Sequence, residues 1–502
     1  MSARGQDVGL ALLVGVWPVF LRTLAMRWLP GPGGSDPDLW VLSAHNLSVG
    51  AESPMPPLFP SLLRPALWAG LDGVTAAVAV STLALALVGV GSVLLVRWAG
   101  GGRGLAVLAG VLATSTPAVA VLSLKAQPDA LVALTLLGAS AVAWRWVREE
   151  KVPHAVLVAL VLTVALAPLL RAHGLLVGLL LCGLAFVGGR GRTWVGAAAV
   201  AAMGLGPLAL GLLPDWPWDL PWHDRLFRAV VSDNDPMAGL PEEVRRALVD
   251  LDSPLPGFFD RPIWALRQAP GCWSWGAVGL ASALTLGWRD RALVVGLLPA
   301  LTALLTWSSP RHVAVAVPVA VVLWAIGLSR ASRTHWWVAG GAIAGLLSLV
   351  QAVPVAERLV IEARRVDTLR SFGKALCAEV EPGDLGTGST ELFLYCPLPL
   401  HQPDGSGTDW RVWAVGRRPQ GPGWVRQDVG HQRVYRLASP PGLPRPCSEL
   451  TVADDTPFVA TPVEPAHGAP TCEGPARLWQ HAPAKEDSVL ESRRVRPGGR
   501  KP

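Results

Sequence analysis

Charged side chains are scarce in this chain. Only 16% of its 502 residues are Asp, Glu, Lys or Arg, whereas 51% are hydrophobic and the mean hydropathy is +0.39. A soluble globular domain usually carries about 25% charged residues. The composition therefore excludes a soluble globular protein of this length and predicts an integral membrane protein.

The motifs of common soluble enzymes are absent as well. The sequence has no His-Glu-x-x-His, no Gly-x-Ser-x-Gly and no cluster of histidines, and the glycine run at 100–104 is not followed by Gly-Lys-Ser/Thr. An ATP-driven machine is therefore disfavoured. No two cysteines have Cys-x-x-Cys spacing, which argues against a zinc site.

Apolar residues dominate from residue 9 to about residue 354, and the remainder is polar and rich in Pro and charge. We therefore predict a transmembrane domain at 1–354, a soluble domain at 355–487 and a basic tail at 488–502 that is expected to be disordered. The first apolar run lacks a small-residue cleavage site, so we expect a retained anchor helix.

The apolar runs are long enough to cross a bilayer, which takes about 20 residues in a helix. Breaks of Arg, Lys, Gly and Pro separate them. They predict an α-helical polytopic membrane protein with about eleven transmembrane helices, at 9–27, 74–96, 104–122, 129–147, 155–170, 174–189, 193–213, 272–288, 292–307, 312–329 and 336–354.

Basic residues in the connections set the expected orientation. One set of connections holds Arg97, Arg103, Arg145, Arg148, Lys151, Arg190, Arg192, Arg289, Arg291, Arg330 and Arg333. The alternate short connections hold only Lys125, Arg171 and Arg311. The positive-inside rule therefore predicts a cytoplasmic amino terminus, and an odd number of helices places the polar carboxyl region outside. Two longer loops, 28–73 and 214–271, are expected on that outer face.

The polar region predicts a small mixed α/β domain. It contains a charged helical pattern at 357–379 and strand-like runs at 391–395 and 411–415, with Pro and Gly turns between them. Its four cysteines are Cys377, Cys396, Cys447 and Cys472. In an oxidising compartment they would form up to two disulfides in any of three connectivities, and the alternative is four unpaired thiols.

Two carboxylates, Asp36 and Asp38, lie in a proline-containing loop between the first two long apolar runs. The structural interpretation is a turn in which Asp36 caps a short helix. Desolvation makes an ionisable side chain at a membrane boundary costly. A functional role for the two carboxylates is therefore favoured more strongly than it would be in a soluble protein.

Lys125, Arg171 and Arg311 depart from the topology rule that the other basic residues obey. A phosphate group at the outer face would need such cations, although snorkelling to the interface is the simpler explanation. His173 and His312 adjoin this set and are either phosphate donors or solvated side chains. Asp129 either caps the next helix or orients a cation.

Three segments of the acidic loop resemble the first outer loop of the GT-C membrane glycosyltransferases, in particular the bacterial branch related to protein O-mannosyltransferases and lipid A aminoarabinose transferase. Asp36-Pro37-Asp38-Leu39-Trp40 stands where that family has Asp-Glu-x-x-Tyr, Ala44-His45-Asn46-Leu47 where it has a segment like Ala-Arg-Asn-Leu, and Pro56-Pro57-Leu58-Phe59-Pro60 where it has Pro-Pro-Leu-Tyr-Pro. Pro37 and Trp40 depart from the family pattern.

Later segments extend the resemblance to about residues 9–330. Pro128-Asp129-Ala130-Leu131 is similar to a Pro-Asp-x-Leu segment, and Arg171 lies before Gly174 where relatives carry a basic residue before a Gly. Arg311-His312 followed by Pro318 is similar to an Arg-Tyr then Pro pattern.

The resemblance implies an enzyme that transfers a sugar, with inversion, from a polyprenyl-phosphate-linked donor to a hydroxyl of a lipid, glycan or protein. The expected location is the extracytoplasmic face of a bacterial inner membrane. Asp36 would be the general base. The cations Lys125, Arg171, His173, Arg311 and His312 would bind the donor phosphate, and Asp38 and Asp129 would support the acceptor or a metal ion.

No cofactor is predicted with certainty. Asp36, Asp38 and Asp129 offer oxygen ligands to a divalent metal ion, but their separation is no dedicated ligand spacing, so the metal stays unassigned. The competing class is a polytopic transporter or lipid flippase, which usually shows two related halves with interrupted helices; this sequence shows none. A membrane-anchored assembly protein with a structural acidic loop is a third class.

Overall fold

The computed structural model describes residues 3–26, 40–41, 43–44, 47, 56–149, 153–187, 269–298, 313–331, 334–380, 385–388, 396, 411–415, 425–429 and 432–438. The predicted helix at 193–213, nearly all of the loop at 214–271 and the tail at 488–502 lie outside these residues.

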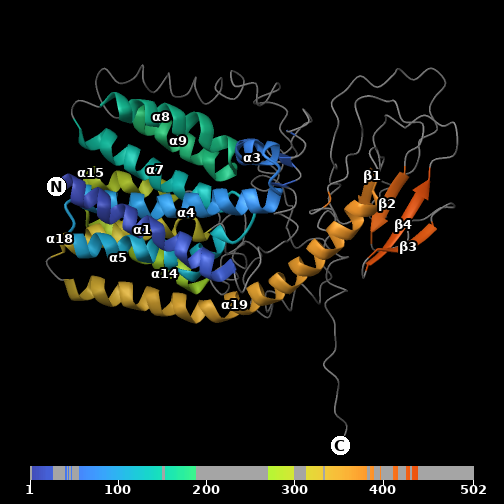
Figure 1. Ribbon diagram of the computed structural model, residues 1–502. Helices are drawn as coiled ribbons and strands as arrows, with labels where there is room; N and C mark the ends of the chain where they lie inside the picture. The colour runs from blue at the N-terminus through green and yellow to red at the C-terminus, as the bar shows by residue number, and fades with distance from the viewer. Residues whose placement is uncertain are drawn as a thin grey trace, which may run out of the picture.

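The apolar region folds into a bundle of helices that run side by side along its long direction (Figure 1). The helices and 3₁₀ turns (η) are α1 (Ala3–Met26), α3 (Leu58–Trp68), α4 (Gly73–Trp98), α5 (Arg103–Ser115), α6 (Pro117–Ala120), η1 (Val121–Ser123), α7 (Asp129–Arg148), α8 (His154–Leu166), η2 (Ala167–Leu169), α9 (Ala172–Val187), α14 (Pro270–Thr285), α15 (Trp288–Arg291), η3 (Ala292–Gly296), α18 (Val317–Arg330) and α19 (Thr334–Glu379).

Four of the described helices are long and apolar enough to cross a membrane. They are Gly5–Leu24, Gly73–Trp98, Asp129–Arg148 and His335–Val353, and a bent pair formed by α5 with α6 and η1 would make a fifth. The shorter apolar helices at His154–Leu169 and Val317–Arg330 do not reach the required length. An apolar helical membrane protein agrees with the sequence, whereas the number of eleven spans stays a prediction.

The distribution of side chains on α19 fits lipid as the surrounding solvent. This helix exposes large apolar residues such as Trp336, Leu346 and Leu349. Towards the bundle it buries the small residues Ala344 and Ser348 instead. A water-exposed helix shows the opposite arrangement, because it turns its large apolar side chains towards the core. Small residues at a helix interface allow close backbone approach inside a bilayer.

The predicted helix at 104–122 is broken in the structure. α5 ends at Ser115, and the α6–η1 segment continues at 61° to it. Pro117 begins α6, and the preceding residue Thr116 has an extended ψ of 124°. Proline lacks the N–H that a continuous helix needs and disfavours helical geometry in the residue before it, which explains the bend.

α19 is longer than the predicted span at 336–354. Its 46 residues also include the charged pattern at 357–379, so one helix replaces the two expected around Pro354. At 1.5 Å per residue it is about 70 Å long, more than twice the hydrocarbon thickness of about 30 Å. The second half of α19 therefore extends beyond the bundle towards the carboxyl-terminal sheet (Figure 1).

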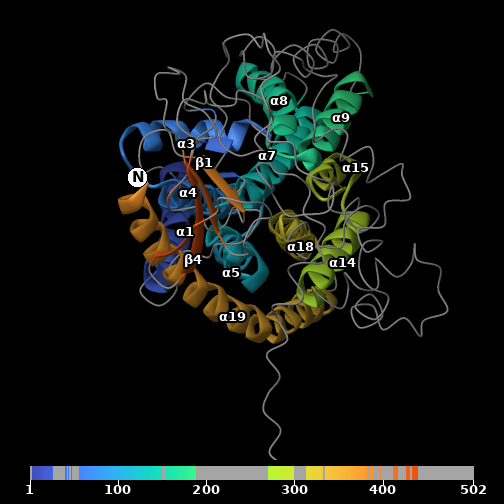
Figure 2. The ribbon, with the colours of Figure 1, turned by 90° about the vertical axis from the view of Figure 1, so that its right-hand side faces the viewer.

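The sheet contains β1 (Leu385–Gly388), β2 (Arg411–Val415), β3 (Val425–Val429) and β4 (Gln432–Ala438) in the order β1-β2-β4-β3. β1 pairs with β2 in parallel, and the other pairings are antiparallel. The predicted strand at 411–415 coincides with β2, whereas the one at 391–395 lies outside the described residues. The sheet lies beyond the end of the bundle that carries α3, and Figure 2 views the bundle from that end.

Candidate functional site

The end of the bundle where α1 begins is held together by ion pairs. Asp7 binds Arg97 and Arg103, each at 3.1 Å, and so joins α1 to α4 and α5. Asp290 of α15 likewise joins α15 to α7 and α18. Members of the predicted set of basic residues therefore share this end of the bundle, as the alternation of basic connections requires.

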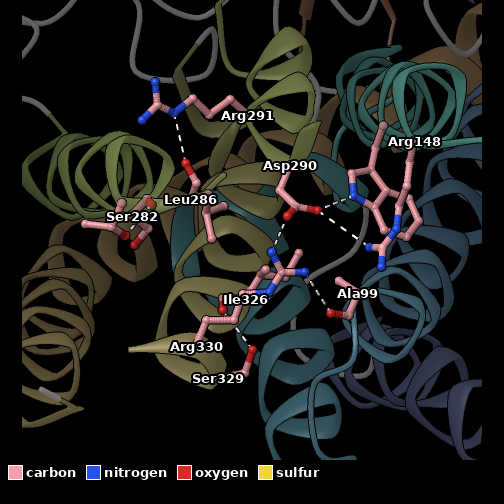
Figure 3. A network of polar contacts seen from close by, with 11 residues as sticks. Ala99, Arg148, Ser282, Leu286, Asp290, Arg291, Ile326, Ser329 and Arg330 are labelled. Atoms are coloured by element: carbon pink, nitrogen blue, oxygen red, sulfur yellow. Dashed lines mark hydrogen bonds and ion pairs between the residues drawn. The ribbon is translucent and has the colours of Figure 1, made fainter. Parts of the chain in front are cut away.

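Asp290 is the centre of the network in Figure 3. Its carboxylate accepts a 2.7 Å hydrogen bond from the indole nitrogen of Trp144 and pairs with Arg330, and Arg148 approaches within 3.7 Å. Burial raises the pKa of this carboxyl, but hydrogen bonds from Arg330 and Trp144 outweigh it, so the pKa lies below its ordinary value. The acid thus stays ionised, and we assign this network to holding the helices together.

The opposite end carries those residues expected to be functional that the structure describes. There Trp40 of the first motif segment is buried and packs edge-to-face on Phe59 of the third, with ring centroids 5.8 Å apart. Phe59 belongs to α3, which packs on α4. The structure therefore brings together two segments of the acidic loop that lie 19 residues apart in the sequence.

The turn between η1 and α7 carries Lys125 and Gln127. The hydroxyl of Ser81 in α4 donates a 2.9 Å hydrogen bond to the carbonyl oxygen of Gln127, which fastens this turn to the bundle. Gln127 is buried, and Lys125 is half-buried and makes a polar contact. The turn is thus built into the packed end of the bundle, and Lys125 has a defined position in it.

Asp129 and Arg171 form a buried ion pair across this end. Asp129 opens α7, Arg171 lies between η2 and α9, and the carboxylate contacts a terminal nitrogen of the guanidinium. The side chain of Asp129 is 1% exposed and that of Arg171 is 15% exposed. Neither carboxylate oxygen of Asp129 accepts a hydrogen bond within the described residues, so Asp129 does not cap α7, whose N-cap is Pro128. Of the two roles considered for Asp129, the geometry therefore favours orienting a cation.

Gly174 shapes the connection that presents Arg171. A Cβ atom at this position would overlap the carbonyl group of Ala167, and the Gly174 N–H donates a 2.8 Å hydrogen bond to the carbonyl oxygen of Arg171. The backbone of α9 therefore approaches η2 more closely than any residue with a side chain allows. This contact explains the glycine that follows the basic residue in the sequence.

The remaining predicted site residues are placed only in part. Asp36, Asp38, Arg311 and His312 lie outside the described residues, and of His173 only the backbone in α9 is described. Among the residues that the structure describes, no group of three His, Cys, Asp or Glu side chains could hold a metal ion.

Sequence reasoning overlooked two arginines at this end. Arg64 of α3 lies over the ring of Trp68 at 4.8 Å. Arg22, near the end of α1, is only 5% exposed. Arg22 lies inside the apolar run predicted as the helix at 9–27, and an arginine within such a run is the signal that could have identified it.

Comparison with known proteins identifies the fold. No family model matches the chain, and no curated protein sequence matches it. The crystal structure of ArnT from Cupriavidus metallidurans bound to undecaprenyl phosphate aligns with a TM-score of 0.52 and 13% identity, covering 87% of this chain and 98% of ArnT. The apo structure of the same protein aligns with the same TM-score and coverage at 14% identity.

A third match is more distant. The oligosaccharyltransferase of Archaeoglobus fulgidus, solved with zinc and sulfate, aligns with a TM-score of 0.40 and 14% identity, covering 78% of this chain and 61% of that one. That score is too low to support an inference. The alignments to the two ArnT structures span nearly the whole of ArnT, and the chain accordingly shares the fold of ArnT.

Proposed function

We propose that the protein transfers a sugar from a polyprenyl-phosphate-linked donor to a hydroxyl acceptor at the extracytoplasmic face of the membrane. The observation that carries this proposal is the match to ArnT over 98% of that chain, in a structure that contains undecaprenyl phosphate. A lipid-linked donor also suits a bundle with a lipid-facing exterior and a sequence without a nucleotide-phosphate motif.

The Asp129–Arg171 pair supports the binding of a phosphate. The guanidinium of Arg171 is held by Asp129, and the planar N–H donors of a guanidinium match the oxygens of a phosphate. A cation that the fold has already oriented stabilises the charge developing on the leaving group without reorganisation. We assign this role to Arg171, supported by Lys125, Arg311, His173 and His312.

Asp36 is the proposed general base. Its carboxylate would take the proton of the acceptor hydroxyl while that oxygen attacks the anomeric carbon, and the bond from that carbon to the phosphate oxygen would break with departure of the polyprenyl phosphate. A single displacement inverts the anomeric configuration. Trp40, four residues after Asp36 in the sequence, is buried against Phe59. Asp38 is assigned a supporting role at the acceptor.

Two observations support the extracytoplasmic location. The structure contains a disulfide between Cys377 and Cys396, at the sheet end of α19, and structural disulfides persist in oxidising compartments. The ion-paired basic end lies at the other end of the bundle, as the positive-inside rule requires for a bacterial inner-membrane protein.

The decisive experiment is a transfer assay with purified protein, a panel of polyprenyl-phosphate sugars and an acceptor extract. We expect Asp36→Asn to lower the transfer rate about 10²- to 10⁴-fold, because the general base is lost. Asp38→Asn is the matched control and should retain more activity. Unchanged transfer by Asp36→Asn would remove the proposed base. Ion-coupled solute uptake by the wild type without any transfer would instead support the transporter class.

A further inference from the structure

Arg22 is a buried cation in an apolar helix. The residue is 5% exposed, and its Nε and Nη1 atoms are fully buried and form no hydrogen bond within the described part of the chain. Removing a guanidinium from water is costly unless an anion and hydrogen bonds replace the lost hydration. The side chain therefore requires an anion that the described residues do not supply.

The other end of α1 shows the contrast. There Arg97 and Arg103 share Asp7, and the adjacent Arg330 pairs with Asp290. The fold thus places acids beside several arginines of the opposite end. Arg22 departs from this pattern, although it is more deeply buried than the side chains of Arg97 or Arg103.

Helix register places Arg22 near the candidate site. α1 and α4 run in opposite directions, because Asp7 contacts Arg97 and Gly15 contacts Ala86 and Val90. Continuing this register from Gly15, Arg22 lies at the level of roughly residue 81 in α4. Ser81 is the residue that holds the turn carrying Lys125 and Gln127.

Helix α5 leads to the same position. It runs parallel to α1, with Asp7 opposite Arg103 and Trp17 hydrogen-bonded to Ser115 at 2.6 Å. Arg22 follows Trp17 by five residues, so it lies towards the end of the bundle at which α5 ends. Two independent helix pairs thus locate this cation at the end of the bundle that holds the Asp129–Arg171 pair.

We propose that Arg22 binds the phosphate of a polyprenyl phosphate. A planar guanidinium offers paired N–H donors that match phosphate oxygens and is more weakly hydrated than an ammonium group, so it suits a buried phosphate site. The same turn region of α1 exposes Val19, Phe20 and Leu24, an apolar face along which a polyprenyl chain can lie. The inference rests on the proposed function and adds a phosphate ligand that sequence reasoning did not assign.

The test measures lipid binding and does not depend on transfer. Thermal shifts of the purified protein are recorded with undecaprenyl phosphate, with uncharged undecaprenol and with inorganic phosphate. The variants are Arg22→Met and Arg22→Lys, and Arg103→Met is the control that removes one cation from the opposite end. We expect the wild type and Arg103→Met to be stabilised by undecaprenyl phosphate, and Arg22→Met to bind it about 10- to 100-fold more weakly, because charge-assisted hydrogen bonds are lost.

Each outcome decides the proposal. Equal binding of undecaprenyl phosphate by Arg22→Met and the wild type overturns it, as does an equal response of the wild type to undecaprenol. A response to inorganic phosphate alone assigns a free-anion site and overturns the lipid assignment. If Arg22→Met does not fold, Arg22→Lys keeps the charge, and undiminished binding by that variant overturns the guanidinium–phosphate contact.

The proposed function can fail separately. Binding that depends on Arg22 without any sugar transfer would leave the phosphate site standing and remove the transferase. Sugar transfer at an unchanged rate in the Arg22 variants would support the transferase and remove the proposed phosphate contact of Arg22.

Discussion

At the scale of residues, the Asp129–Arg171 ion pair is the clearest feature of the candidate site. Both partners are withdrawn from water, Asp129 almost completely. Each charge is therefore tolerated mainly because the other is present.

Removal of one partner should consequently cost more than removal of both. We expect Asp129→Asn or Arg171→Met alone to lower the free energy of unfolding by about 3–5 kcal/mol, because an unpaired charge remains buried. The double variant should be less destabilised than the sum of the single variants. Thermal denaturation in detergent, analysed as a double-mutant cycle, measures this coupling, and strictly additive effects would contradict the ion pair.

Gly174 provides a second test at this scale. Gly174→Ala should destabilise the protein by about 1–3 kcal/mol, because the new methyl group would collide with the Ala167 carbonyl. Gly183 lies in the same helix, and a methyl group added there would meet open space among the described residues, so Gly183→Ala is the matched control. It should be neutral or stabilising by about 0.5–1 kcal/mol. Equal melting temperatures for the two variants would refute the close contact.

At the scale of elements, the short helix α15 is held between longer neighbours by Asp290. Its carboxylate accepts a hydrogen bond from Trp144 of α7 and pairs with Arg330 of α18. Arg330 also donates a 3.0 Å hydrogen bond to the carbonyl oxygen of Ala99, the residue that follows α4. Four segments of the bundle therefore depend on one acid.

We expect Asp290→Asn to lower the free energy of unfolding by about 1–3 kcal/mol. The control is Glu149→Gln, which removes a more exposed ion pair with Arg145 within one helix end and should change stability by about 0.3–0.5 kcal/mol. Melting curves of the two variants in the same detergent make the comparison. Equal effects would show that the Asp290 network adds nothing to the bundle.

The same acid predicts a pH dependence. Its pKa in the folded protein lies below the ordinary value of 3.8, so its stabilising effect is complete above that value and is lost as the pH falls through the folded-state pKa. Below about pH 4 the wild type should lose more stability than Asp290→Asn, and the two melting temperatures should converge. A constant difference down to the most acidic pH would contradict this assignment.

At the scale of the whole molecule, the disulfide between Cys377 and Cys396 links the end of α19 to the chain of the polar region. It joins residues separated by 19 positions, and closing a loop of this length in the unfolded chain corresponds to about 3 kcal/mol of stabilisation. Cys182 and Cys272 are buried free thiols in the bundle.

This arrangement predicts a labelling pattern in intact cells. In a variant with Cys447→Ser and Cys472→Ser, a membrane-impermeant maleimide should label the protein only after treatment with a membrane-impermeant reductant. Labelling before reduction would contradict the disulfide. Absence of labelling after reduction, in a protein that is labelled once denatured, would contradict the extracytoplasmic location.

Much of the bundle was predictable because hydropathy acts locally. The runs at 74–96 and 129–147 correspond closely to α4 (Gly73–Trp98) and α7 (Asp129–Arg148), since a helix in lipid must satisfy its backbone within one segment. The bend at Pro117 and the continuity of α19 were missed. In the first case a single proline ended a helix inside an apolar run, and in the second a helix continued after its apolar run had ended.

The membrane class, the positions of several spans, the alternation of basic connections and the motifs that resemble a glycosyltransferase family can all be read from the amino-acid sequence. Which distant residues meet follows from the packing of the chain: Asp129 with Arg171, Trp40 with Phe59, and Cys377 with Cys396. The reason is that hydropathy and spacing are properties of one segment, whereas burial of a charge, a ring or a thiol depends on how segments pack. The isolation of Arg22 became visible only in the same way, because a buried cation without an acid beside it among the described residues is a property of the packed bundle.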